Sequence, residues 1–276
     1  MRDVPGDGVL VRALTGRFER VALFGGVYSN WRAVDAVVAD AKAQGAEQVV
    51  FLGDCGGTGP HPDRTIERLV EHDVSTVQGN YDDSIGRELD DCACGYTDPR
   101  DNTFAALSYA YTRAHTSSDA RAFLRAMPRS ARIEIGPVRA LLCHGSPRRQ
   151  NEFLWQSVTP AGFVERLCSE HDTDLVVCTH TGLHWELRVG QRGLVNVGAA
   201  GRPANDGQLH GWYTLLTWDG AHVVTEFRPV RYDVDGLIAD MRAEALPEEF
   251  VQTVATGWWT TCLECLPGRE RRRGLH

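Results

Sequence analysis

The sequence predicts an α/β fold, because short apolar runs of strand type alternate with helical patterns from Val21 to about Val230. Such alternation indicates parallel strands joined by crossover helices. At 276 residues the chain can bury a large core, and one domain with an extension fits this length. Hydrophobic residues form 42% and charged residues 24% of the chain, as in an ordinary globular enzyme.

The clearest alternation lies in the first third of the chain. After an apolar strand that begins near Val21, residues 33–45 predict a helix, since their apolar side chains share one face and Gly45 suits its end. The next helix, 62–72, opens with proline near its first turn. The strand that follows it ends at Gly79, which completes a β-α-β-α-β pattern.

The rest of the chain predicts an insert, a hairpin and a set of later strands. Residues 86–101 are rich in Asp, Gly and Cys and predict a long loop. Gly136-Pro137 is a turn pair and predicts a hairpin. The later strands are expected to be antiparallel, because their connections are short. The remaining predicted helices are 102–115, 118–127, 160–170 and 233–256, and the remaining strands are 174–178, 194–197, 213–218 and 223–229.

These elements predict a boundary near each end of the chain. Residues 1–18 show little periodicity and are expected to form an N-terminal extension. The main domain is expected over 19–232, with a helical insert around 86–127. Residues 233–276 are expected to form a C-terminal helical extension whose charged tail is solvated. This extension either packs over the domain or pairs with another copy, which leaves a homo-oligomer open.

Charge and hydropathy exclude several classes of protein. A net charge of −8 and a pI near 5.7 argue against nucleic acid as a partner, since nucleic-acid binders usually show a basic footprint. No stretch approaches the roughly 18 apolar residues that a membrane span needs, and no signal peptide opens the chain. We therefore expect a cytoplasmic protein without a membrane partner. The near absence of lysine is typical of a GC-rich bacterial genome.

The cysteines are expected to be reduced. A chain with eight cysteines in a cytoplasmic setting favours free thiols over disulfides. Cys92 with Cys94 and Cys262 with Cys265 can form a four-thiolate zinc site. Their wide separation along the chain favours the alternative, which is two unrelated thiol pairs.

Polar residues suited to bind a metal follow four of the predicted strands. They are Asp54, Asn80, His144 and His180. Loops at the carboxyl ends of strands carry the chemistry of open α/β sheets, so we expect these side chains to converge. A carboxylate, an amide oxygen and two imidazoles suit one divalent transition metal, namely Mn, Fe, Zn or Ni. Alone, each residue has an ordinary alternative as a helix cap, a turn residue or a packed histidine.

The same segments resemble those of the calcineurin-like metallophosphoesterase superfamily. The resemblance covers roughly residues 20–230 and implies a two-sheet β-sandwich flanked by helices, in four layers. It also implies a metal-dependent phosphoesterase. The matching segments are Gly53-Asp54-Cys-Gly-Gly-Thr-Gly59, Gly79-Asn80-Tyr-Asp82, Cys143-His144-Gly145-Ser146-Pro147, Cys178-Thr-His180-Thr and Asn196-Val-Gly198.

The sequence departs from the family pattern at three places. Gly26 and Tyr28 occupy the positions of the first Asp-x-His pair, and Tyr81 replaces the histidine that assists catalysis in the family. The closing Gly-His-x-His motif keeps His180 but loses its second histidine. One metal position therefore retains its complete set of ligands, and the other retains only Asp54. We expect a single metal, unless Tyr28 or His184 holds a second one.

Two residues are candidates for the catalytic proton transfers. His184 lies four residues after His180 and can act as a ligand or general acid; its alternative is a turn histidine packed against Trp185. Tyr28 can bind the metal as a phenolate or donate to a phosphate oxygen; its alternative is to fill space. Asp82 and Asp83 can orient the histidines or serve in a turn.

Four residues are candidates for binding the substrate. Arg148 and Arg149 follow the His144 motif and can each donate two hydrogen bonds to a phosphate, unless they form a solvated basic turn. Asn30 can cap the first helix or contact an anion there. Arg202 follows the Asn196 motif and is a further candidate substrate contact.

The leading functional hypothesis is a metal-dependent phosphatase that hydrolyses a small phosphorylated metabolite with metal-activated water. A nucleoside monophosphate is one candidate, because several tryptophans offer stacking surfaces. The first alternative is a non-catalytic sensor or scaffold that binds a metal or a phosphorylated ligand, since three family positions are lost. A phosphodiesterase is the second alternative.

Overall fold

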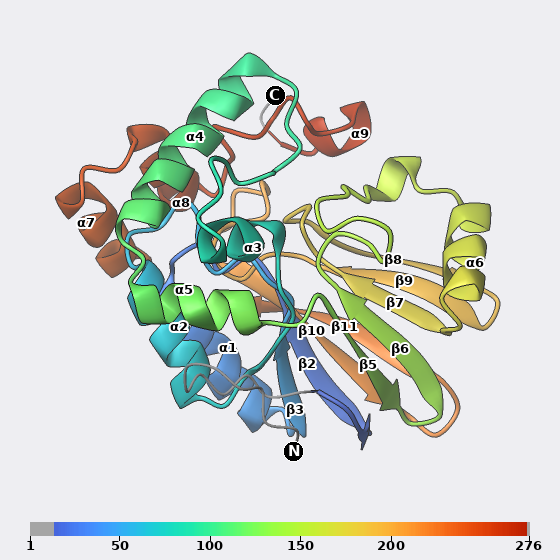
Figure 1. The fold of residues 1–276 in the computed structure, drawn as a ribbon. Helices are drawn as coiled ribbons and strands as arrows, with labels where there is room; N and C mark the ends of the chain where they lie inside the picture. The colour runs from blue at the N-terminus through green and yellow to red at the C-terminus, as the bar shows by residue number, and fades with distance from the viewer. Residues whose placement is uncertain (1–13, 275–276) are drawn as a thin grey trace.

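The structure is a computed structural model that describes residues 14–274. Two β-sheets pack face to face, and helices cover both outer surfaces (Figure 1). The six-stranded sheet has the order β1 (Arg17–Phe18), β5 (Ser130–Ile135), β6 (Val138–Cys143), β7 (Leu175–Cys178), β9 (Arg192–Val197) and β8 (His184–Val189). The five-stranded sheet has the order β11 (Val223–Val230), β10 (Gly211–Trp218), β2 (Arg20–Phe24), β3 (Gln48–Phe51) and β4 (Ser75–Thr76).

The strand pairing follows the predicted alternation except at β9, which was expected to be antiparallel but pairs in parallel with β7. β2, β3 and β4 pair in parallel, as do β6, β7 and β9, while β10 and β11 form an antiparallel pair. The hairpin around Gly136-Pro137 joins β5 to β6. The predicted four-layer sandwich is therefore confirmed. Of the predicted N-terminal extension, residues 1–13 lie outside the described part, and Arg17–Phe18 forms β1 beside β5.

The helices complete the layers. α1 (Trp31–Ala43), α2 (Pro62–Glu71), α3 (Asn80–Gly86) and α5 (Ser118–Ala126) supply residues to the core on the outer face of the five-stranded sheet. α6 (Ala161–Glu170) covers the six-stranded sheet. The other helical segments are α4 (Pro99–Ala114), the 3-10 turn Gln156–Val158, α7 (Val234–Ala243), α8 (Glu248–Thr256) and α9 (Gly268–Arg271).

The central core lies between the two sheets. Leu23 and Leu52 from one sheet and Leu142 and Val177 from the other are completely buried there. Each such side chain contributes roughly 1.5–3 kcal/mol by leaving water. This apolar layer fixes the sheets against each other, so that the carboxyl ends of β3, β6 and β7 lie at the same end of the molecule (Figure 1).

The C-terminal extension packs back onto the main domain, at the end where α4 also lies (Figure 1). The tail differs from the solvated end that the sequence predicted. Glu270 is only 4% exposed, and its carboxylate accepts hydrogen bonds from the backbone N–H and hydroxyl of Ser157. A carboxylate that accepts two such bonds is compensated for its burial, which explains why this part of a charged tail docks.

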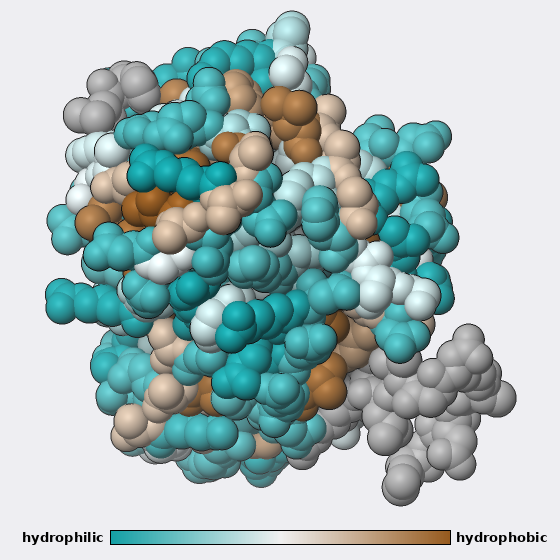
Figure 2. Space-filling view, turned by 90° about the vertical axis from the view of Figure 1, so that its left-hand side faces the viewer, coloured by the Kyte–Doolittle hydropathy of each residue, from teal (hydrophilic) through white to brown (hydrophobic). Residues whose placement is uncertain are grey.

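Hydrophilic residues cover most of the face shown in Figure 2, and hydrophobic residues form small separate areas among them. No helix among residues 14–274 combines the length and the apolar character needed to cross a bilayer.

Candidate metal centre

Three of the four predicted ligands meet at the carboxyl ends of strands from both sheets. Asp54 follows β3, His144 follows β6 and His180 follows β7, and their ligand atoms all lie within 4.8 Å of one another. His144 Nε2 is 3.2 Å from an Asp54 carboxylate oxygen and 3.1 Å from His180 Nδ1. The convergence predicted for these residues is therefore present.

The backbone bends sharply at two of these residues. Asp54 has φ +68° and His180 has φ +70°, in the left-handed region that non-glycine residues rarely adopt. Such conformations persist only where the surroundings stabilise them, and they are frequent at functional sites. Gly53 makes the bend at Asp54 feasible, since a Cβ there would lie 2.3 Å from the backbone nitrogen of Gly79.

Asp82 stabilises the backbone bend at Asp54. Its carboxylate accepts hydrogen bonds from the backbone N–H groups of Gly79, Asp54 and Cys55 at 2.8–2.9 Å. Burial and the Asp54 charge raise the pKa of Asp82 to about 6. Of the two roles weighed for this residue, the geometry supports the one in a turn.

A backbone contact sets the orientation of His144. Its Nδ1 donates to the carbonyl oxygen of Leu52 at 2.7 Å. In the neutral imidazole the single proton is then on Nδ1, and the lone pair of Nε2 faces Asp54 and His180. Burial favours this neutral form, but the Asp54 charge outweighs it and raises the pKa of His144, so a metal would displace a proton from Nε2 on binding. His144 is therefore held in the tautomer that a metal ligand requires.

Asn80 presents an acceptor that has no partner among residues 14–274. Its Nδ2 donates to the Cys92 carbonyl at 2.8 Å, and its buried Oδ1 lacks a hydrogen bond. The next residue, Tyr81, donates its N–H to the Asp54 carboxylate at 3.2 Å, which places Asn80 beside the cluster. The buried Nε2 of His180 is unpartnered as well. Buried polar groups are costly without partners, and a divalent cation would satisfy the free oxygen.

The protonation states suit the same interpretation. Burial favours a neutral Asp54, but His144 outweighs it and holds the pKa of the Asp54 carboxyl below its usual range. Burial and the neighbouring His144 lower the pKa of His180 to about 3. A charged carboxylate and a neutral imidazole are the forms that bind a metal. Asp54, Asn80, His144 and His180 thus fit one divalent metal.

Tyr28 fills the space beside Gly26. A Cβ built on Gly26 would lie 2.6 Å from Cζ and Oη of Tyr28, so the phenol ring occupies the volume that a side chain at position 26 would need. Burial raises the pKa of Tyr28 to about 12, which keeps the hydroxyl protonated and disfavours the phenolate ligand considered above.

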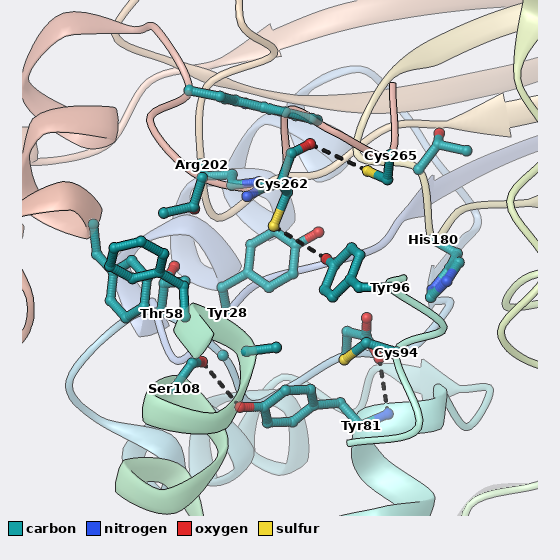
Figure 3. A pocket seen from close by; sticks show the side chains of 18 of the residues that line it. Tyr28, Thr58, Tyr81, Cys94, Tyr96, Ser108, His180, Arg202, Cys262 and Cys265 are labelled. Carbon is teal, nitrogen blue, oxygen red and sulfur yellow. Dashed lines mark hydrogen bonds between the residues drawn. The ribbon is translucent and has the colours of Figure 1, made fainter. Parts of the chain in front are cut away.

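A cavity of about 60 Å³ adjoins the cluster (Figure 3). Asp54, His180 and Tyr28 line one part of it, and Arg202 lines another. The Tyr81 ring also faces it, with its hydroxyl 2.9 Å from Ser108 Oγ. The C-terminal extension and the insert contribute to its lining with Trp259, Cys262, Cys265, Cys94 and Tyr96.

The sequence reasoning assigned no role in the site to these residues of the C-terminal extension and the insert. Trp258-Trp259 and the paired cysteines were visible as unusual features, but no strand end or family motif links them to the metal residues. Cys92 and Cys94 form a disulfide, contrary to the expected reduced state. Among residues 14–274 the only cluster of metal-ligand type is that of Asp54, His144 and His180, so the thiol pairs form no zinc site there.

Arg148 and Arg149 lie outside this cavity. They line a separate open groove, which Asn80 and His144 also reach. Arg148 pairs with Glu152 and stacks 4.8 Å from the Phe163 ring, and the Arg149 side chain is 71% exposed. Their guanidinium groups are thus engaged by Glu152 or solvated. The phosphate contact predicted for them stays a prediction, and it would lie in this groove and not in the cavity.

His184 and Asn30 also lie apart from the cavity. The His184 ring packs 4.1 Å from Trp212 and 4.8 Å from Phe227, and burial lowers its pKa to about 4. Asn30 caps α1 by accepting from the Ala33 N–H, and donates to the Gly201 carbonyl at 3.1 Å. The structure thus supports the helix-cap alternative for Asn30. His184 is held by packing too, but it lies in β8 against Trp212 and Phe227 and not in a turn against Trp185.

Comparison with known proteins agrees with this architecture. The model of the calcineurin-like phosphoesterase superfamily domain matches residues 20–220. The uncharacterized protein MJ0912 of Methanocaldococcus jannaschii is 23% identical over 243 residues, which cover 83% of this chain and 94% of that protein. The metallophosphoesterase from Sphaerobacter thermophilus is 25% identical with a TM-score of 0.65, over 87% of this chain and 99% of that one. The hypothetical protein PH1004 of Pyrococcus horikoshii OT3 has the same fold, with a TM-score of 0.70 at 20% identity over the same shares.

A two-sheet sandwich that gathers a carboxylate and two imidazoles at its strand ends is the architecture of a metallophosphoesterase. The chain belongs to the calcineurin-like phosphoesterase superfamily.

Proposed function

We propose that the protein is a metal-dependent phosphoesterase that removes a terminal phosphate from a small metabolite. The observation that carries this proposal is the cluster of Asp54, His144 and His180 beside the unpartnered Oδ1 of Asn80. These residues supply a mixed oxygen and nitrogen ligand set, which suits one Mn, Fe, Zn or Ni ion. When bound, such a metal lowers the pKa of water and stabilises charge on a phosphoryl oxygen.

The residues of the chain have separate roles in this proposal. Asp54, Asn80, His144 and His180 hold the metal, while Asp82 keeps the Asp54 turn in place. The ordering of His144 by the Leu52 carbonyl supports metal binding through Nε2. The protonated hydroxyl of Tyr28 lies in the cavity wall and is a donor for a phosphate oxygen.

The size of the cavity supports a monoester over a diester. Its volume of about 60 Å³ corresponds to roughly two water molecules, which matches a terminal phosphoryl group better than one substituted on both sides. A nucleoside would require the C-terminal extension or the insert to move away. A small phosphorylated metabolite is therefore the substrate class that we favour.

Hydrolysis of a panel of phosphomonoesters and diesters by metal-loaded protein tests the proposal. We expect turnover of small monoesters that depends on added Mn, Fe, Zn or Ni. The His144→Ala/His180→Ala variant removes both imidazoles and is expected to lose this activity. Equal rates for the two proteins, or activity on diesters alone, would contradict the proposed function.

A second candidate is a non-catalytic sensor of a phosphorylated ligand. The ring of Tyr28 over Gly26 favours it, because this ring occupies space beside the retained ligands in a closed site. The sensor hypothesis predicts binding of metal and ligand with no turnover of any ester in the panel. Measurable metal-dependent turnover would exclude it.

A further inference from the structure

Arg202 is a buried cation that has no carboxylate partner among residues 14–274, and its polar neighbours are Tyr28 and Cys262. Its side chain lines the cavity beside the metal centre, the residue is 9% exposed, and its Nε has no hydrogen-bond partner. Among the ion pairs of residues 14–274, no carboxylate pairs with this guanidinium, whereas Arg32, Arg68 and Arg228 each pair with an aspartate. Guanidinium stays charged in proteins, and a buried charge is costly unless it is paired.

Two aromatic rings hold the guanidinium in place. Its Cζ lies 4.0 Å from the centre of the Trp259 ring and 5.0 Å from that of Tyr28. Trp259 is itself fixed, because its Nε1 donates to the Pro203 carbonyl at 2.7 Å and its backbone N–H to Asn205 at 2.8 Å. Arg202 is thus pre-organised by stacking, and little side-chain freedom remains to be lost when a ligand binds.

The cavity contains the donors that an oxyanion needs. Figure 3 shows Arg202 and Tyr28 on one side of it and His180 on another. The Tyr28 hydroxyl is a donor, and the free N–H of Arg202 is a second one. Most of the remaining lining is aromatic or aliphatic, and a low-polarity wall strengthens the attraction between a guanidinium and an anion.

We propose that Arg202 and Tyr28 form an oxyanion site for the terminal phosphate group, adjacent to the metal centre and able to bind phosphate without the metal. This inference deepens the proposed function and rests on it for the identity of the anion. The fixed guanidinium would stabilise negative charge on the phosphoryl oxygens that lie nearest to Gly26 and Tyr28. One metal and one arginine would then share the stabilisation of the phosphate.

Calorimetric titration of chelator-treated, metal-free protein with inorganic phosphate tests the site. We expect saturable binding to the wild-type protein and at least tenfold weaker binding to Arg202→Met, which keeps an unbranched apolar side chain and loses the guanidinium charge. Tyr28→Phe, which removes one donor, is expected to weaken binding severalfold. Arg148→Met is the matched control, since Arg148 lies in the separate groove and pairs with Glu152.

Absence of phosphate binding to the metal-free wild-type protein would overturn the inference, as would unchanged affinity in Arg202→Met. Loss of binding in Arg148→Met alone would move the site to the groove and also overturn it. If Arg202→Met does not fold, Arg202→Lys replaces it, because lysine keeps the charge but lacks the planar fork; reduced affinity supports the site and full affinity opposes it. Phosphate binding without turnover would contradict the proposed function and leave the oxyanion site intact.

Discussion

Gly26 and Tyr28 act together, because the phenol ring of one residue occupies the space left by the missing side chain of the other. Neither position can change freely alone. A side chain at position 26 would lie 2.6 Å from the ring, although its φ of +47° is one that aspartate tolerates better than most residues. In the proposed single-metal site, the pair fills the volume where the side chain of a second metal ligand would lie.

Restoring a carboxylate at position 26 provides a test of this arrangement. Gly26→Asp alone is expected to lower the free energy of unfolding by about 1–3 kcal/mol, because it overpacks a filled volume. The double variant Gly26→Asp/Tyr28→His removes the ring and adds two ligands beside Asp54. We expect it to bind more than one metal per chain, as measured by elemental analysis. Tyr28→His alone is the control and should keep one; a double variant with no additional metal would argue against this account.

At the scale of elements, a small ionic cluster docks the C-terminal extension on the main domain. Asp240 on α7 accepts a hydrogen bond from Arg32 on α1 at 2.8 Å and lies 3.0 Å from Nε2 of His61, which precedes α2. Burial alone would raise the pKa of Asp240, but its hydrogen bonds to Arg32 and His61 outweigh this and hold it below the ordinary value of 3.8. The docking of α7 therefore depends on a charged carboxylate.

This cluster predicts a loss of stability in acid. A carboxyl group whose pKa is lower in the folded state stabilises the fold above its unfolded pKa, and this contribution disappears as the pH falls through the folded pKa. We expect the free energy of unfolding to decline from about pH 5 downward, with Asp240 contributing less than about 1 kcal/mol, since the group is partly exposed. Asp240→Asn should flatten this decline in denaturant titrations from pH 6 to pH 3. An unchanged pH profile in the variant would show that Asp240 does not contribute.

Element prediction from the sequence succeeds where local signals are strong and fails where packing decides. Proline at the first turn of α2 and the apolar face of α1 identify these helices without further information. The predicted helix over 233–256 is instead two helices, because Ala245 has φ +52° and Pro247 opens α8. β8 was not predicted, since its register is set by pairing with β9 rather than by strict alternation.

At the scale of the whole molecule, the proposed metal ligands come from both sheets. Asp54 and Asn80 follow strands of the five-stranded sheet, and His144 and His180 follow strands of the other. An ion bound by all four would link the layers, which otherwise contact each other through apolar side chains. Binding to the folded state alone stabilises it by about 2.7 kcal/mol at a free metal concentration of 100 times Kd.

Metal removal is therefore expected to lower the thermal unfolding midpoint by roughly 5–10 °C. Differential scanning calorimetry of chelator-treated protein, before and after readdition of Mn or Zn, measures this shift. The His144→Ala/His180→Ala variant should show no response to the same ions. If neither the chelator nor the added metal changes the thermal unfolding midpoint of the wild-type protein, metal binding at this centre is contradicted.

The sequence by itself determined the α/β class, the order of most strands and the four candidate metal ligands, because apolar periodicity and polar strand ends are local signals. The position of Arg202 relative to Tyr28 and Trp259 was decided only by the tertiary structure. These residues are separated by up to 231 positions in the chain, and no periodic pattern relates them. The same holds for His184 and Arg148. Their positions in the sequence suggested roles in proton transfer and phosphate binding, whereas in the structure His184 packs against Trp212 and Arg148 pairs with Glu152. Side-chain contacts between segments that are distant in the chain leave no signal in the local sequence. The lining of the cavity includes residues of the C-terminal extension, so only the tertiary structure shows the whole site.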